Sequence, residues 1–224
     1  MDFNLKGLIF DFDNTLVKSH IDFPAMKISM AQFTKQHGLE FGLEEEIPNK
    51  YTAGNIIDAA DEFDRRNGTL LVPQLWSIVE EFESKGMENL SIDKEVFSLL
   101  NLLKEKNISI ALLTNNSREP TLQVLKEYNL YDYFSVIIAR EDVFRMKPDK
   151  EGICLILQKM NLKINEVALV GDSWVDGRAA INASIRFILF REELLDTEKY
   201  GIEIWQFFSK MEDLIAFIND GIFY

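Results

Sequence analysis

The chain has 224 residues, of which 47% are apolar and 12% aromatic, and its formal net charge at pH 7 is -13. This composition excludes a disordered chain and suits a single domain, or a domain that carries an insertion. The acidic charge argues against nucleic acid and membrane surfaces as partners, since both attract positive charge.

The first predicted element is a buried strand over residues 5–10, a short apolar run that ends at an aspartate. Asp11, Asp13 and Thr15 follow it in the pattern D-x-D-x-T. Because the chain leaves the sheet there, both carboxylates can turn towards one point, where like charges need a cation or a proton between them. The alternative is a solvated acidic turn. The apolar run is too short for a signal peptide, so we expect a cytoplasmic chain.

Residues 17–89 contain helical patterns and no convincing strand. Apolar residues recur at helical spacing over 28–36, 53–66 and 73–85, with Pro73 placed to begin the last helix and Gly86 to end it. We therefore predict an inserted helical domain over 17–89. The remaining core is predicted to comprise residues 1–16 and 90–224.

From residue 91 onward, apolar strands alternate with amphipathic helices. Strands are predicted over 109–113, 134–139, 167–170 and 186–190, and helices over 91–106, 118–128, 149–160, 174–182 and 210–219. Continuous apolar runs indicate strands covered on both faces, so we predict an α/β fold with a parallel, Rossmann-like sheet. Ser91 is the predicted N-cap of its helix. Cys154, the single cysteine, is predicted to be a small buried residue.

Two further motifs follow the second and third strands. The run T-N-N-S at 114–117 places a hydroxyl, amides and backbone N–H groups at the start of a helix, which suits an anion. The alternative is simple helix capping by Ser117. The run K-P-D at 147–149 opens the next helix, and Lys147 could point a compact positive charge into a shared site. The alternative is an exposed lysine.

The fourth motif, G-D-S-W-V-D at 171–176, follows the fourth strand of the series. Asp172 and Asp176 are one helical turn apart, and hard oxygen ligands at this spacing suit Mg²⁺. The alternative is helix N-capping by Asp172. All four motifs follow the carboxyl ends of predicted parallel strands, where open α/β sheets form their binding sites. Their coincidence therefore predicts one active site at that edge.

These motifs, in this order, resemble those of the haloacid dehalogenase-like hydrolase superfamily, in the subgroup that contains phosphoglycolate phosphatases and β-phosphoglucomutase. The family pattern is D-x-D-x-T, then Ser or Thr, then Lys, then G-D-x-x-x-D. The matching residues here are Asp11, Asp13, Thr15, Thr114, Lys147, Gly171, Asp172 and Asp176. The helical insertion resembles the family's cap domain, and the resemblance spans nearly the whole chain.

The resemblance implies a Mg²⁺-dependent phosphatase that acts on a small phosphorylated metabolite, as a monomer or homodimer. It assigns Asp11 as the nucleophile that forms an aspartyl-phosphate, and Asp13 as general acid and then base. The implied Mg²⁺ ligands are Asp11, the Asp13 backbone carbonyl, Asp172 and Asp176, the last directly or through water. The implied phosphoryl-binding groups are the Thr114 hydroxyl, the Asn115 N–H and Lys147. Thr15 would hold the loop.

Two alternatives stay open. A phosphomutase would use the same aspartates and return the phosphoryl group to a sugar. A catalytically silent phosphate-binding or regulatory module would keep the fold without turnover, although none of the expected side chains is missing. Six residues are candidates to line a substrate cleft, and each is also explained as ordinary surface or packing: Lys18, His20, Tyr51, Arg65, Arg140 and Trp174.

Overall fold

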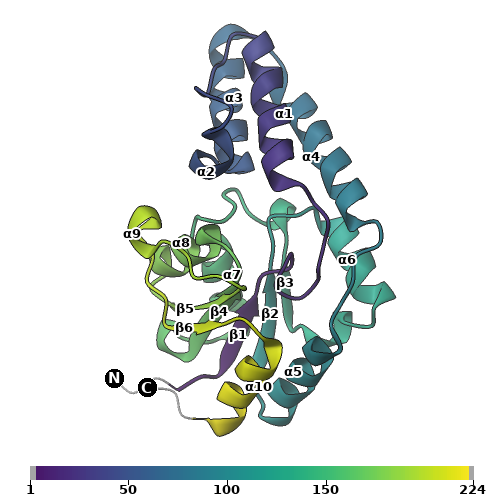
Figure 1. The fold of residues 1–224 in the computed structure, drawn as a ribbon, viewed down its shortest axis with the longest axis vertical. Coiled ribbons are helices and arrows are strands. Elements are labelled where there is room, and N and C mark those ends of the chain that lie inside the picture. The colour runs from purple at the N-terminus through teal and green to yellow at the C-terminus, as the bar shows by residue number, and fades with distance from the viewer. Residues whose placement is uncertain (1–3, 222–224) are drawn as a thin grey trace. The chain divides into compact units, whose positions relative to one another are not determined.

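A computed structural model describes residues 4–221 and places in them one six-stranded parallel sheet, in the order β3-β2-β1-β4-β5-β6 (Figure 1). The strands are β1 (Gly7–Phe10), β2 (Ser109–Leu113), β3 (Val136–Ile138), β4 (Val167–Gly171), β5 (Arg186–Phe190) and β6 (Gln206–Phe208). The predicted α/β fold is confirmed. The strand order reverses between β1 and β4, the position at which open parallel sheets bind ligands.

The chain divides into two compact units. One contains the residues up to Lys18 and from Ser91 onward, and the other is Ser19–Leu90. In the first unit, Lys18 and Ser91 form an isolated antiparallel bridge, with N–H···O distances of 2.8 and 3.2 Å. The predicted capping role of Ser91 is therefore wrong, since its backbone closes this bridge. Asp93 occupies the N-cap position instead, and helix α5 runs over Lys94–Glu105.

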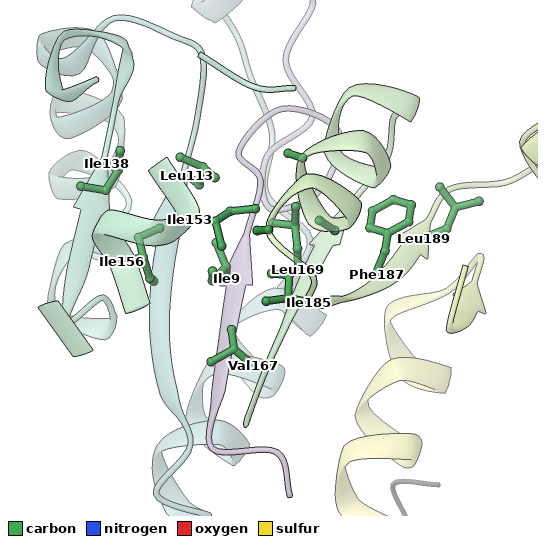
Figure 2. Packing of buried hydrophobic residues seen from close by; sticks show 14 residues of the cluster. Ile9, Leu113, Ile138, Ile153, Ile156, Val167, Leu169, Ile185, Phe187 and Leu189 are labelled. Carbon is green, nitrogen blue, oxygen red and sulfur yellow. The ribbon is translucent and has the colours of Figure 1, made fainter. Parts of the chain in front are cut away.

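Helices cover both faces of the sheet. Figure 2 shows one face, where Ile9, Leu113 and Leu169 belong to the same buried cluster as Ile153 and Ile156. The helices on that face are α7 (Glu151–Met160) and α8 (Trp174–Asn182). In the central strands β1, β2 and β4 the alternate residues are also buried and point the other way, as the pleat requires. On that second face α5 contacts β2, and α10 (Met211–Asp220) packs against α5.

Short elements account for most of the differences from the sequence-based assignment. Strand β6 was missed because three residues carry no periodicity, and only pairing with β5 identifies them. The other short elements are α9 (Thr197–Tyr200) and the 3-10 turns Tyr131–Tyr133, Arg140–Asp142 and Ile164–Glu166. Helix α6 covers Arg118–Glu127. The prediction that Cys154 is buried is wrong: α7 buries Ile153 and Ile156, and Cys154 is rotated away from that face.

The second unit is helical, and the structure describes all of residues 19–90 without a strand among them. Its helices are α1 (Phe23–Gln36), α2 (Ile47–Lys50), α3 (Ala53–Asn67) and α4 (Leu71–Met87). They pack around their own apolar core, which includes Met30, Ile56 and Leu75. Helix α1 begins before residue 28 because the Asp22 carboxylate caps it by accepting from Ala25 N at 2.9 Å. None of the helices in residues 4–221 is both long and apolar enough to cross a membrane.

Candidate active site

The loop after β1 buries two carboxylates at the carboxyl edge of the sheet. Asp11 continues the strand pairing by donating its backbone N–H to the Val170 carbonyl at 2.9 Å. The chain then turns tightly: Asn14 adopts a left-handed φ of 56° and donates its N–H to the Val17 carbonyl at 2.7 Å. This turn leaves Asp11 only 8% and Asp13 only 6% exposed. The alternative of a solvated acidic turn is therefore wrong.

Lys147 enters the site from the loop that precedes α7. Asn115 holds its backbone on both sides, because Asn115 Nδ2 donates to the Lys147 carbonyl at 2.9 Å and Oδ1 accepts from Lys147 N at 3.0 Å. The Lys147 ammonium donates to Asp11 Oδ1 at 2.5 Å and to Asp176 Oδ1 at 2.7 Å. Lys147 is only 5% exposed, so the alternative of an exposed lysine is also wrong.

Asn116 belongs to the T-N-N-S run, but its contact with Asp13 was not predicted. Its Nδ2 donates to Asp13 Oδ2 at 2.5 Å, and the residue is 3% exposed. Its backbone N–H donates to Thr114 Oγ1 at 3.1 Å, so the Thr114 hydroxyl keeps its own proton for an anion. Ser117 stands at the N-cap of α6, but its hydroxyl donates to Glu141 Oε1 at 2.8 Å and makes no capping hydrogen bond.

The end of β4 brings a third carboxylate against the strand. A Cβ on Gly171 would lie 2.5 Å from Asp176 Cγ, so only glycine allows this approach. Ser173, and not Asp172, is the N-cap of α8, and its backbone N and Oγ donate to Asp176 Oδ2 at 3.2 and 2.5 Å. Asp176 is 1% exposed. Asp172 is half-buried and takes no part in this cap.

Asp11, Asp172 and Asp176 form a three-carboxylate cluster in which one oxygen from each residue lies within 4.8 Å of the others. Carboxylates this close repel each other unless a cation lies among them. Lys147 provides one positive charge against these three groups and Asp13. The cluster offers only carboxylate oxygens, the donors that Mg²⁺ prefers, and no thiolate or imidazole that would favour zinc. Its residues therefore fit a magnesium ion.

Burial and repulsion raise the pKa values of Asp11 and Asp172. The pKa of Asp11 lies well above its ordinary 3.8, first because of desolvation and then because of the charge of Asp176, with Lys147 opposing both. The same two causes raise the pKa of Asp172 from 3.8 to about 7. Desolvation lowers the pKa of Lys147, but Asp11 and Asp176 outweigh it and the net shift is upward. The site therefore has too little positive charge for its carboxylates, a deficit that a divalent cation would offset.

Arg191 is a second cation near the cluster that the sequence did not indicate. It follows β5, and its Nη1 donates to the Asp172 backbone carbonyl at 3.3 Å. Its charge opposes the rise in the pKa of Asp172. In the sequence it stands in the run R-E-E, which reads as solvated surface. Only the pairing of β5 with β4 identifies it as a neighbour of the site.

The remaining sequence candidates have other contacts. Lys18 pairs with Asp93 at 2.7 Å and is exposed. Arg65 pairs with Asp61 one turn earlier on α3. Trp174 stacks on Tyr200 with ring centroids 5.4 Å apart. Thr15 is buried in the β1 loop, but its hydroxyl has no hydrogen-bond partner among the described residues. If Thr15 stabilises the loop as predicted, it therefore does so by packing and not through a hydrogen bond of its hydroxyl.

Comparison with known proteins places these features in a family. Residues 8–190 match the family described as haloacid dehalogenase-like hydrolase. A phosphoglycolate phosphatase of Yersinia pestis is 30% identical, over 79% of this chain and 76% of the relative. A pyrophosphatase PpaX of Oceanobacillus iheyensis is 23% identical, over 97% of this chain and 99% of the relative.

Solved structures show the same fold. A HAD-superfamily hydrolase from Ehrlichia chaffeensis has a TM-score of 0.60 at 23% identity and covers 98% of both chains. A predicted phosphoglycolate phosphatase from Haemophilus somnus has a TM-score of 0.64 at 17% identity and covers 96% of this chain and 98% of its own. The family match includes the ends of β1, β2 and β4, where the candidate site lies. This chain belongs to the haloacid dehalogenase-like hydrolase family.

Proposed function

We propose that this chain is a Mg²⁺-dependent phosphatase that hydrolyses a small phosphorylated metabolite through an aspartyl-phosphate on Asp11. The observation that carries this proposal is the buried Asp11 carboxylate, bound by Lys147 at 2.5 Å and adjoining the carboxylates of Asp172 and Asp176. A nucleophile, a fixed cation and a metal-binding donor set thus meet at the switch point of the sheet. Phosphoryl transfer needs little beyond such positioning and charge.

The proposed reaction has two halves. In the first, an Asp11 carboxylate oxygen attacks phosphorus, the bond from phosphorus to the leaving oxygen breaks, and Asp13 gives that oxygen a proton. In the second, Asp13 takes a proton from a water molecule that attacks the same phosphorus. The bond from phosphorus to Asp11 then breaks, which releases inorganic phosphate and restores the Asp11 carboxylate.

The other site residues would bind and orient the phosphoryl group. The Thr114 hydroxyl has a proton to donate, and the Lys147 ammonium stands beside the nucleophile. Asn115 would act here through its backbone N–H as well as by holding Lys147. Asp11, Asp172 and Asp176 would hold Mg²⁺ together with the Asp13 backbone carbonyl, and a bound Mg²⁺ supplies positive charge that offsets the phosphate oxygens.

We further propose that the helical unit, predicted at 17–89 and compact over Ser19–Leu90, serves as a mobile cap that excludes water and selects the substrate. Two relatives suggest the first substrates to test. One is named a phosphoglycolate phosphatase and the other a pyrophosphatase, so a small phosphate ester and pyrophosphate are the leading classes.

The test is a panel of phosphorylated metabolites, including phosphoglycolate and pyrophosphate, assayed for release of inorganic phosphate with Mg²⁺ and after chelation with EDTA. Rapid quenching with radiolabelled substrate, followed by peptide mapping, should find the label on Asp11. Full turnover after chelation, or label on another residue, contradicts the proposal. Transfer to a sugar without phosphate release indicates a phosphomutase. Binding of phosphate without turnover of any substrate indicates a silent module.

A further inference from the structure

We infer that Asn116 is a positioning residue for proton transfer: it holds the Asp13 carboxyl group in one orientation through both halves of the reaction. This inference rests on the proposed phosphatase function. It concerns a residue of the T-N-N-S run whose side chain binds Asp13 instead of facing an anion, and which reaches Asp13 from a different strand end, 103 residues away in the chain.

The contact is direct and buried. Asn116 Nδ2 donates to Asp13 Oδ2 at 2.5 Å, and both residues are almost completely shielded from solvent. In a buried position water competes little for the carboxylate, so one hydrogen bond is sufficient to fix its rotation. The side chain of Asp13 can otherwise turn about its terminal torsion, which is broad for carboxylates.

The backbone of Asn116 is held in place from two directions. The Asn116 backbone N–H donates to Thr114 Oγ1 at 3.1 Å, and its carbonyl accepts from Arg140 N at 3.1 Å. The ends of β2 and β3 therefore fix the backbone from which the Asn116 side chain reaches Asp13. A group held on both sides loses little further freedom when it binds its partner, and this is the requirement for a positioning residue.

The type of donor also differs between the two catalytic aspartates. Asp11 is bound by the ammonium of Lys147, whereas Asp13 is bound by a neutral amide. An amide N–H can bind one oxygen of a carboxyl group whether or not the other oxygen carries a proton. Asp13 has to give a proton in one half-reaction and take one in the other, so a donor of this type can stay in place through both.

The sharpest test uses two substrates of similar size. The leaving group of p-nitrophenyl phosphate departs without a proton, whereas benzyl phosphate releases an alkoxide that needs one. In Asn116→Leu, kcat/KM for benzyl phosphate should fall on the order of tenfold or more, and kcat/KM for p-nitrophenyl phosphate less than about threefold. A purely structural role would lower both equally, and that result, or no change in either, overturns the inference.

The second half-reaction gives an independent readout. With p-nitrophenyl phosphate, Asn116→Leu should form the aspartyl-phosphate at a near-normal rate and hydrolyse it slowly, so trapped label should accumulate on Asp11 relative to the wild type. In a variant that already carries Asp13→Asn, residue 13 no longer transfers a proton. Adding Asn116→Leu should therefore leave the ratio of kcat/KM for the two substrates unchanged. A further change of the ratio in that background contradicts the inference.

Thr121→Val is the matched control. Thr121 lies on α6, close to Asn116 in the chain, is fully buried, and its hydroxyl donates to the Ser117 carbonyl at 2.7 Å. Losing that bond should lower the melting temperature without changing the ratio of kcat/KM for the two substrates.

If Asn116→Leu does not fold, Asn116→Ser decides the question, since serine is too short to reach Asp13. If the wild type forms no aspartyl-phosphate on Asp11, the proposed function is contradicted. If the wild type forms it normally and Asn116→Leu leaves the ratio of kcat/KM for the two substrates unchanged, only the role of Asn116 is contradicted.

Discussion

The ends of β1 and β4 each carry two aspartates, but the two members of each pair are held differently. Asp13 and Asp176 accept hydrogen bonds from neutral donors in their own surroundings, namely Asn116 and Ser173. For Asp11 and Asp172, burial and the charge of Asp176 are instead the leading influences, and both pKa values are raised. One member of each pair is oriented by neutral donors. The other has a pKa raised by burial and repulsion, and for Asp11 the hydrogen bond from Lys147 does not cancel that rise.

The difference indicates which carboxylates of the site carry repulsion that a cation would relieve. Groups with strongly perturbed pKa values are candidates for binding or chemistry, which fits Asp11 and Asp172. Asp13, the proton-transfer group of the proposed reaction, is instead oriented by a neutral donor. Asp11 and Asp172 lie at the switch point between β1 and β4 and face the same Lys147 and Asp176. The comparison therefore predicts that substitutions at the two kinds of position have different consequences.

Asp11→Asn should have the largest effect. An amide is nearly isosteric with a carboxylate but is a far poorer nucleophile, so kcat should fall on the order of a thousandfold or more. The fold should survive, because Lys147 keeps Asp176 as a partner and the repulsion between Asp11 and its neighbouring aspartates is removed. Phosphate release and thermal melting without metal measure the two effects. Near-normal turnover, or a large fall in melting temperature, would contradict this account.

Lys147→Met should instead destabilise the metal-free protein. Without the Lys147 ammonium, the buried carboxylates of Asp11 and Asp176 lose their positive partner. Such a loss lowers the free energy of unfolding by about 3–5 kcal/mol. Denaturant unfolding at pH 8 measures the loss, and Mg²⁺ should recover part of it. Lys6→Met is the control, because it breaks a more exposed ion pair with Glu166 and should cost less than about 1 kcal/mol. Equal losses in the two variants would contradict the importance of the buried cluster.

Gly171→Ala should weaken metal binding without removing any ligand. The added Cβ would overlap Asp176 and push its carboxylate away from the strand end. Asp176 is one of the proposed Mg²⁺ ligands, and disturbing the support of a ligand typically costs 10- to 100-fold in metal affinity. The Kd for Mg²⁺ measured by calorimetry should therefore rise by about that factor. Gly152→Ala provides an equally close overlap, 2.5 Å from Leu113 Cδ1 in the apolar core. It should lower stability while leaving the Kd for Mg²⁺ unchanged.

Asp172→Asn should have the smallest effect, a change in melting temperature that depends strongly on pH. Because folding raises the pKa of Asp172 from 3.8 to about 7, its contribution to the stability of the metal-free protein is complete below pH 3.8 and is lost as the pH rises through 7. Asp172→Asn should therefore raise the melting temperature of the metal-free protein at pH 8 by roughly 2–4 °C, equivalent to about 1 kcal/mol. The gain should disappear at pH 5.

The same titration predicts the pH dependence of metal binding. Mg²⁺ binds the ionised carboxylate and competes with its proton, so the affinity of the wild type should fall as the pH drops below 7. Calorimetric titrations at pH 8 and pH 6 measure the change. A Kd that does not depend on pH over this range would contradict the shared position of Asp172 and Asp11 in the cluster.

The sequence by itself determined the local parts of this protein. Continuous apolar runs predicted five of the six strands, since burial on both faces leaves a mark within a single strand. Helical spacing likewise predicted the longer helices of both units, although caps such as Asp22 moved their ends. Asp11, Lys147 and Asp172 could be singled out because each stands at a strand end or helix start in a recognisable pattern.

Tertiary structure alone decided which side chains meet. Asn116 reaches Asp13 across 103 residues, and Lys147 reaches Asp11 across 136, because β1 lies between β2 and β4. The position of Arg191 beside Asp172 depends in the same way on β5 pairing with β4. Periodicity records which face of an element is buried, but it does not record strand order. Contacts across strands depend on that order, which is set by packing the whole sheet.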